Sequence, residues 1–335
     1  NLGELTEEEY GAELYRTNKL PVLIYLDGED PDGLKGVKAD KLAYVKAARY
    51  KGAKDLIEKR QNKYQWVIAG VPSVKWAKKV FPSLSKTQAV NALWEAILKT
   101  ARADDGNGLE NWEKHDATLK EKCAKLNAMR LKKLHYVSSN GTDFTVGLIP
   151  GVKFEGGGEK TLQGVYFEPN IPSEECFTSP MKGEAEGIVY SAKPLVYQSQ
   201  LIDKFWIRFE KGKAVDCHAE VGEDLLRSIF SLDEGSAYLG ECALVPFDSP
   251  INNTGLIFYS TLYDENAACH LALGKGFTSL YPNFEKYTEE EIHAFGINKS
   301  LSHVDFMIGT KDLDITGIDE DGKEIAIFRN GNFAF

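Results

Sequence analysis

The chain has 335 residues and a formal net charge of -10, with 50 Asp and Glu side chains against 40 Lys and Arg. That length allows two domains with sizeable cores, and the acidic balance argues against non-specific nucleic-acid binding, which needs basic surface to neutralise phosphates. No apolar run is long enough to span a bilayer. No basic segment followed by an apolar one opens the chain, so we expect neither a membrane span nor a signal peptide.

The cysteines fit no zinc-finger spacing, and their odd number without a Cys-x-x-Cys pair predicts buried free thiols in a reducing compartment. They are Cys123, Cys176, Cys217, Cys242 and Cys269. Cys176, Cys242 and Cys269 each follow or precede a candidate ligand, and we interpret them as small apolar packing residues. A nucleophilic cysteine is the alternative, but adjacent side chains of an extended segment point to opposite faces.

The first part of the chain alternates helix and strand signals. Thr6 followed by Glu9 is typical of a capping box at a helix start. The apolar runs Leu20–Leu26 and Tyr64–Ala69 predict buried strands. Helices are predicted over Ala39–Arg60 and around Ser73–Val80, Lys86–Ala103 and Leu109–Leu134. This alternation predicts a parallel sheet covered by helices.

From about Leu134 onward, short apolar runs are separated by Gly, Asn, Asp and Pro, and Asn140-Gly141 and Asp321-Gly322 predict hairpin turns. Strands are predicted at Phe144–Ile149, Gly164–Phe167, Gly187–Tyr190 and Phe205–Phe209. Helices are predicted near Gly222–Leu232, Asn266–Leu273 and Glu289–Phe295, the last capped by Thr288. The predicted fold class is therefore α/β plus α+β: an N-terminal α/β domain over residues 1–134 with a parallel-type sheet, and a C-terminal β-rich α+β domain over residues 135–335 that carries a metal site.

Carboxylates and imidazoles in the C-terminal half form a candidate ligand set for a divalent metal such as zinc, cobalt or manganese. The set is Glu175, Glu241, His270, His303 and Asp305. Glu241 is embedded in an apolar run, so it must pair, accept hydrogen bonds or bind a metal. His303 and Asp305 point the same way if their segment is a strand, although a His–Asp hydrogen bond without metal explains them equally well.

The other two candidates have plainer alternatives. His270 lies among Ala and Leu residues, where a lone histidine is usually a core group, but Asp264 and Glu265 lie nearby as possible partners. Glu175 belongs to a doubled carboxylate in a Pro-containing loop, which also fits surface charge. Taken together the set points to a metallohydrolase.

The remaining histidines and motifs indicate no further functional site. His115 and His293 lie in charged helical stretches and are expected to be exposed, and His135 and His218 have no partner pattern. Gly156-Gly157-Gly158 lacks the context of a phosphate loop. No nucleophile elbow for a serine hydrolase is found.

Several blocks in order carry a family resemblance. They are 76–82, 93–97, 170–180, 187–195, 240–246, 261–274, 302–309 and 328–332. Over nearly its whole length the chain resembles peptidase family M29, the thermophilic aminopeptidases that include aminopeptidase T, aminopeptidase S and PepS. The resemblance implies a cytoplasmic homodimer that removes N-terminal residues from peptides in an enclosed cavity. It also implies two divalent metal ions (Zn, Co, Mn or Mg) held by Glu175, Glu241, His270, His303 and Asp305, with Glu241 bridging them.

The chain departs from the family pattern at two places. Members usually carry a further segment before the helix at Thr6, and its loss would remove part of the first sheet. Members also often have a tyrosine seven residues after the ligand histidine, proposed to assist catalysis. Phe277 stands there, and a phenyl ring donates no hydrogen bond to an oxyanion. Tyr281 and Tyr263 are the nearest substitutes.

The expected mechanism is hydrolysis by a water that bridges the two metals. A carboxylate outside the ligand set takes the proton of this water, and Glu265 is the candidate, with Glu174 second. Glu265 serves equally well as a hydrogen-bond partner of His270. Two alternatives to an aminopeptidase are a catalytically weak peptide-binding homologue and a two-metal hydrolase of another ester or amide. A phosphoesterase needs basic residues near the ligands, and Arg329 and Lys275 are isolated in the sequence.

Overall fold

The structure is a computed structural model that describes residues 3–335, and the chain divides into two compact units. One unit is the chain up to Trp94 together with Gly158–Ile171, and the other is Glu95–Gly157 with Pro172–Phe335. The boundary predicted at residue 134 falls inside the second unit, within strand β3 (Leu131–Val137). No helix of the described part of the chain is both long and apolar enough to cross a membrane.

The first unit holds a small parallel sheet with the strand order β1-β2-β7. The predicted capping box opens its first helix, where Thr6 Oγ1 accepts from the backbone of Glu9 and the Glu9 carboxylate accepts from the backbone of Thr6. Its elements are α1 (Glu7–Lys19), β1 (Leu23–Asp27), α2 (Ala39–Arg60), β2 (Trp66–Gly70), α3 (Val74–Val80), β5 (Glu159–Lys160), β6 (Tyr166–Phe167) and β7 (Asn170–Ile171). Helix α4 (Lys86–Thr100) then leads the chain into the second unit. The parallel pairing predicted for this part of the chain is confirmed.

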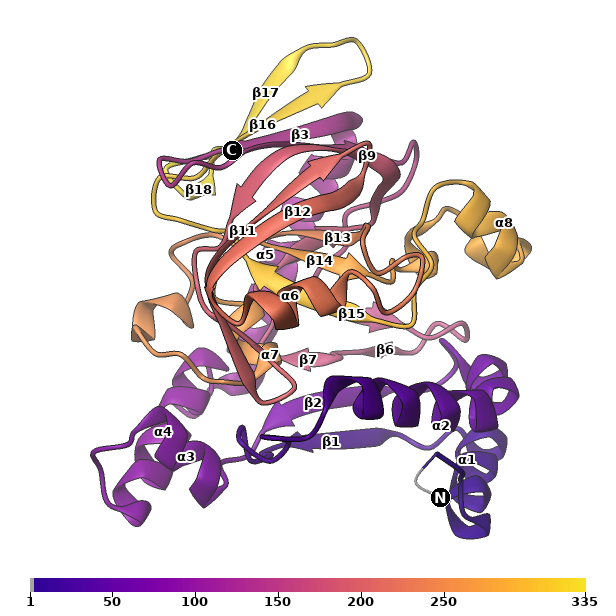
Figure 1. Cartoon of the computed structure of the whole chain (residues 1–335), viewed down its shortest axis with the longest axis vertical. Coiled ribbons are helices and arrows are strands. Elements are labelled where there is room, and N and C mark those ends of the chain that lie inside the picture. The colour runs from indigo at the N-terminus through magenta and orange to yellow at the C-terminus, as the bar shows by residue number, and fades with distance from the viewer. Residues whose placement is uncertain (1–2) are drawn as a thin grey trace. The chain divides into compact units, whose positions relative to one another are not determined.

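Two antiparallel sheets build the second unit (Figure 1). The nine-stranded sheet contains, in order, β10 (Leu195–Tyr197), β11 (Gln200–Glu210), β9 (Pro180–Tyr190), β4 (Asp143–Leu148), β3, β16 (Asp314–Asp319), β17 (Glu324–Arg329) and β18 (Asn332–Phe333), with β12 (Lys213–Val221) beside β11. The four-stranded sheet has the order β15 (His303–Met307), β14 (His270–Gly274), β13 (Leu239–Leu244) and β8 (Cys176–Thr178). The predicted turns at Asn140-Gly141 and Asp321-Gly322 join antiparallel neighbours, β3 to β4 and β16 to β17.

The helices of this unit correct two predictions. They are α5 (Gly108–Ala128), α6 (Glu223–Ile229), α7 (Thr261–Glu265) and α8 (Glu289–Ala294), with short 3-10 turns η1 (Asn252–Thr254), η2 (Thr278–Leu280) and η3 (Phe284–Lys286). The helix predicted to reach Leu134 ends at Ala128, because Arg130 takes a left-handed φ of 51° and β3 follows. The helix predicted over Asn266–Leu273 is wrong, because β14 begins at His270 and pairs with β13 and β15 on both sides. Thr288 caps α8 as predicted.

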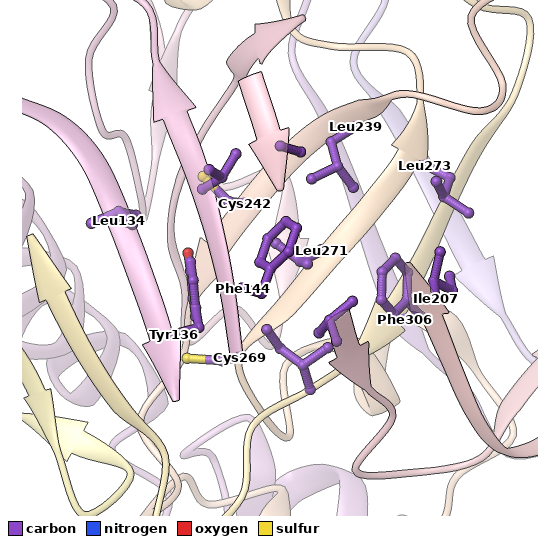
Figure 2. Close-up of a cluster of buried hydrophobic side chains, with 14 of the residues drawn as sticks. Leu134, Tyr136, Phe144, Ile207, Leu239, Cys242, Cys269, Leu271, Leu273 and Phe306 are labelled. Carbon is purple, nitrogen blue, oxygen red and sulfur yellow. The ribbon is translucent and has the colours of Figure 1, made fainter. Parts of the chain in front are cut away.

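Side chains of both sheets meet in one buried cluster (Figure 2). Tyr136 and Phe144 come from the nine-stranded sheet, and Cys242, Leu271 and Phe306 come from the four-stranded one. Side chains alternate along a strand, so in the four-stranded sheet the residues next to these core-facing ones point to the opposite face. The core therefore fixes which residues of β13, β14 and β15 are presented on the second face, and the packing role predicted for Cys242 and Cys269 is confirmed.

Leu271→Ala is expected to lower the free energy of unfolding by about 2–5 kcal/mol, because the loss of a core leucine leaves a cavity. Leu271 is fully buried in this cluster, whereas Leu301, the site of the control variant Leu301→Ala, is 62% exposed. A change at such an exposed position costs about 0.5 kcal/mol or less. Denaturant unfolding of both variants checks the difference. Equal losses would show that Leu271 does not support the core.

Candidate metal centre

The face of the four-stranded sheet opposite to the core carries four of the candidate ligands. Across the strands, Glu241 lies opposite Ala272, which in turn lies opposite Asp305. His303 lies opposite Gly274 at the next position of the same face. The small side chains at 272 and 274 leave space between the larger polar groups. The strand register thus explains why Glu241 and Asp305, which are far apart in the sequence, share one site.

The fourth candidate ligand on this face, His270, and the fifth, Glu175, enter at strand ends. His270 is the first residue of β14 and lies opposite Ala243, on the same face as Glu241. Glu175 precedes β8, and β8 pairs with β13 through Phe177 and Ala243. The structure therefore brings all five predicted residues together.

Their ligand atoms form two overlapping groups. The side chains of Glu175, Glu241 and His270 offer atoms that all lie within 4.8 Å of one another, and so do those of Glu241, His303 and Asp305. Glu241 belongs to both groups and is only 4% exposed. A carboxylate has two oxygens, so one glutamate can serve both groups at once.

Backbone carbonyls orient both imidazoles toward this cluster. His270 Nδ1 donates to the carbonyl oxygen of Ala268 at 3.1 Å, and His303 Nδ1 donates to that of Lys275 at 2.8 Å. Since a carbonyl only accepts, each Nδ1 carries a proton, and each Nε2 faces the carboxylates. This is the arrangement in which a histidine binds a metal through Nε2 while its other nitrogen is held by a backbone acceptor.

The Nε2 contacts are to the candidate ligands themselves. His270 Nε2 lies 3.1 Å from Glu175 Oε2. His303 Nε2 lies 3.0 Å from Glu241 Oε2 and 3.1 Å from Asp305 Oδ1. Each pair therefore aims a nitrogen and a carboxylate oxygen at the same small volume.

Burial and crowded negative charge shift the pKa values of this cluster. Burial raises the pKa of Glu241 to about 7, against the opposing hydrogen bond from His303. Burial lowers the pKa of His270, but the hydrogen bond and charge of Glu175 outweigh it and hold the value at about 10. The pKa of Glu265 is raised by burial and then by the charges of Asp305 and Glu175. Such a concentration of buried acids calls for compensating positive charge.

A divalent cation would supply this positive charge, and the polar atoms of the site fit one. Asp305 Oδ1 is buried and finds no well-aligned hydrogen-bond donor among residues 3–335, although His303 Nε2 is only 3.1 Å away. A buried carboxylate oxygen in this state is costly unless something positive satisfies it. Carboxylate oxygens with imidazole nitrogens are the donor set of zinc, cobalt and manganese.

The two candidate bases differ in their surroundings. Glu265 ends α7, lies outside both ligand groups and is partly buried. Both ring nitrogens of His270 have other partners, so the hydrogen bond to His270 considered for Glu265 is not formed. The carboxylate of Glu174 is instead engaged by the guanidinium of Arg102, with Nη2 2.8 Å from Oε2.

An aromatic pair borders the cluster. The ring centroid of Phe277 lies 5.3 Å from that of His303 and 5.2 Å from that of Phe177. The two tyrosines considered as substitutes for a hydroxyl at Phe277 pack in aromatic stacks, Tyr281 on Phe295 and Tyr263 on Phe258, both at 4.8 Å.

Sequence reasoning missed two residues behind the site. His115, which was expected to be exposed, has a side chain only 10% exposed and donates from Nε2 to the carbonyl oxygen of Ser173 at 2.7 Å. Arg102 was not singled out at all. Trp112 and His115 lie one turn apart on α5 with their rings in edge contact at 5.5 Å. Their spacing in the sequence places the two rings side by side, but it does not indicate that this helix face is covered.

A mixed helix and sheet scaffold with a buried cluster of carboxylates and imidazoles fits a metal-dependent hydrolase. The family of thermophilic metalloproteases (M29) matches residues 2–333. Aminopeptidase AmpS of Bacillus subtilis (strain 168) is 43% identical over 307 residues, which cover 91% of this chain and 75% of that protein. Aminopeptidase T of Thermus thermophilus is 40% identical over 310 residues, covering 92% of this chain and 75% of that protein.

A solved structure agrees with these relatives. The structure of wild-type AmpT from Thermus thermophilus aligns with a TM-score of 0.88 and 36% identity, covering 100% of this chain and 82% of that one. The chain belongs to the M29 family, and its enzyme class is metallo-aminopeptidase. The resemblance read from the sequence blocks is thereby confirmed.

Proposed function

We propose that this enzyme removes N-terminal residues from peptides with two divalent metal ions held by Glu175, Glu241, His270, His303 and Asp305. The observation that carries the proposal is the place of Glu241 in both groups of converging ligand atoms. In two-metal hydrolases the ions lie about 3.5–4 Å apart, which requires a side chain that serves both.

The two groups divide the ligands evenly. One ion would be held by Glu175, Glu241 and His270, and the other by Glu241, His303 and Asp305. Three protein ligands per ion is the number that catalytic zinc sites use, because it leaves a position for water or substrate. The Nδ1 hydrogen bonds of both histidines to backbone carbonyls support this assignment.

When bound, the ions would supply Lewis-acid chemistry that activates water and polarises the scissile carbonyl. Glu265 accepts the proton of the attacking water, since its carboxylate is outside both ligand groups and lies close enough to Asp305 and Glu175 to feel their charge. The free α-amino group of the substrate binds beside the same acidic cluster, which restricts cleavage to the first residue of a peptide.

Chelation is expected to abolish hydrolysis of an aminoacyl chromogenic amide, and cobalt, zinc or manganese is expected to restore it. The reason is that no residue of the cluster replaces the cation that its carboxylates require. Steady-state rates are measured with and without chelator, with elemental analysis of the same samples.

Three other outcomes of this assay would contradict the proposed mechanism or activity. Full activity of protein shown to be free of metal would rule out the mechanism. A metal-loaded protein that binds peptides but turns over none would be a peptide-binding homologue. Preferential hydrolysis of a phosphate ester would indicate the hydrolase alternative.

We also propose that the enzyme works as a cytoplasmic homodimer, as the family resemblance implies. The five cysteines are free and buried, which suits a reducing compartment. Light scattering of the purified chain tests the assembly, and a monomeric mass at working concentration would contradict it.

A further inference from the structure

The segment from Ser173 to Glu175 presents one metal ligand and is itself neither helix nor strand. The chain enters the second unit at Pro172, so Pro172, Ser173 and Glu174 are all that precede the ligand there. An irregular segment holds a side chain in a fixed place only if its backbone is fixed by contacts from outside. The sources of those contacts decide how well Glu175 is positioned.

Two side chains from distant elements bind the backbone of this segment. His115 of α5 donates from Nε2 to the carbonyl oxygen of Ser173 at 2.7 Å. The backbone N–H of Glu174 donates to Oδ1 of Asn266 at 2.7 Å, and Asn266 is fully buried. The same Asn266 donates from Nδ2 to the carbonyl of Leu262 at 2.9 Å, so it is held from both sides. The backbone just before Glu175 is therefore tied to α5 and to the end of α7.

Arg102 holds the side chain next to the ligand. Its Nη1 and Nη2 both bind the carboxylate of Glu174, the second at 2.8 Å. The side chain of Glu174 is 5% exposed and that of Arg102 is 22% exposed, so this pair is largely removed from water. A two-pronged guanidinium–carboxylate pair fixes orientation as well as distance, which a lysine ammonium does not.

The backbone of Arg102 is unusual in a way that fits this role. Arg102 follows α4 and has a left-handed φ of 56°. A residue with a side chain rarely adopts this conformation. The carbonyl oxygen of Arg102 accepts from Nδ2 of Asn111 at 3.0 Å, which holds the turn. Strain of this kind persists only where surrounding contacts over-determine it.

The backbone of Glu175 itself is seated against Gly156. A Cβ added at Gly156 would lie 2.2 Å from the carbonyl oxygen of Glu175, which real Cβ atoms do not tolerate. The ligand segment is thus enclosed by Gly156 on one side and by the contacts of Arg102, His115 and Asn266 on its other parts.

We propose that Arg102 is a positioning residue of the metal centre: through Glu174 it fixes Glu175 and so sets the affinity for the ion held by Glu175, Glu241 and His270. This inference rests on the ligand set of the proposed function. It predicts an effect confined to one of the two ions, because the group of Glu241, His303 and Asp305 contains no residue of the Ser173–Glu175 segment.

The direction in which Arg102→Met changes the metal affinity distinguishes a positioning role of Arg102 from a purely electrostatic one. Arg102→Met removes a positive charge near a cation site, so Coulomb forces alone would strengthen cation binding. If Glu174 takes up a proton once unpaired, the net charge stays the same and electrostatics predicts no change. Only displacement of Glu175 predicts weaker binding.

The test is a titration of chelator-treated full-length protein with cobalt or zinc. Binding is monitored by calorimetry and, for cobalt, by the absorption spectrum. Arg102→Met is expected to weaken one of the two metal-binding steps by about 10- to 100-fold and to leave the other unchanged. This is the loss of affinity usually seen when a residue that supports a metal ligand is removed. Arg130→Met is the matched control: Arg130 also follows a helix with a left-handed φ of 51° and pairs with a glutamate, Glu320, which is not next to a ligand. Its metal titration is expected to match that of the unaltered chain.

Two further variants separate the possible failures. Arg102→Lys keeps the positive charge but loses the two-pronged pair, and it is expected to show the same single weakened step if Arg102→Met proves unfolded by circular dichroism. Glu175→Gln removes the ligand itself. Unchanged or tighter binding in the folded Arg102 variants, while Glu175→Gln is weakened, overturns the positioning role alone. Equal binding by Glu175→Gln and the unaltered chain overturns the ligand set of the proposed function instead.

Discussion

Glu241→Gln is expected to reduce kcat/KM by more than His270→Ala or Glu175→Ala does, and by more than about 100-fold, the upper cost usually seen for residues behind a ligand. Glu241 is the residue common to both ligand groups, so its loss disturbs two ions, whereas His270 and Glu175 each belong to one. The glutamine side chain has nearly the same shape, and it replaces an anionic oxygen with an amide that cannot serve as a bridging anion.

The measurement is steady-state kinetics on an aminoacyl amide, with the metal content of each variant determined in parallel. Glu210→Gln is the control, since Glu210 is exposed and pairs with Arg208 away from the ligand residues in the sequence. Retention of two bound metals and near-normal turnover by Glu241→Gln would mean that this carboxylate does not bridge. A loss of activity equal to that of the single-ion ligands would mean that it serves one ion only.

The sequence predicted which residues meet in the cluster better than it predicted the local structure around them. Glu241 stood out because a carboxylate in an apolar run must be satisfied, and the strand period correctly placed His303 and Asp305 on one face. The segment carrying His270 was predicted to be helical, because a short run rich in Ala and Leu does not distinguish a helix from a buried strand. This segment is a strand because β13 and β15 pair with it on both sides, and such pairing depends on residues far along the chain.

The residues behind the site could not be found from local patterns. Arg102 and Glu174 are 72 positions apart, and neither has a neighbour in the sequence that marks it as part of a pair. His115 lies in a helix whose charged residues are typical of an exposed surface, and its burial depends on contacts with residues far along the chain, such as the Ser173 backbone. Charge in a sequence indicates solvent exposure on average, while a buried ion pair needs both partners to be placed by the fold.

Phe277 stands where the family resemblance led us to expect a tyrosine. Its ring lies 5.3 Å from that of His303, so the side chain borders the cluster. Its backbone N–H donates to Ser179 Oγ at 2.8 Å, which fixes the start of η2 and leaves the ring between Phe177 and His303. Tyr281 and Tyr263 are packed in other aromatic stacks. A hydroxyl added to the ring of Phe277 would therefore be a new polar group at the edge of the site.

Phe277→Tyr is expected to raise the turnover number, by up to about 100- to 1000-fold, with little effect on metal binding. The physical reason is that one hydrogen bond to the developing oxyanion contributes about 3–4 kcal/mol when its geometry is right, and a phenyl ring donates none. Phe177→Tyr is the matched control, because it adds the same hydroxyl to the neighbouring ring, 5.2 Å away, and is expected to give no comparable gain. Steady-state kinetics with metal content checked in parallel measures both. An unchanged or lower turnover number in folded, fully metallated Phe277→Tyr would show that the oxyanion donor lies elsewhere and that Phe277 acts as a wall of the substrate pocket, in which case the change should appear in KM for substrates with large N-terminal side chains.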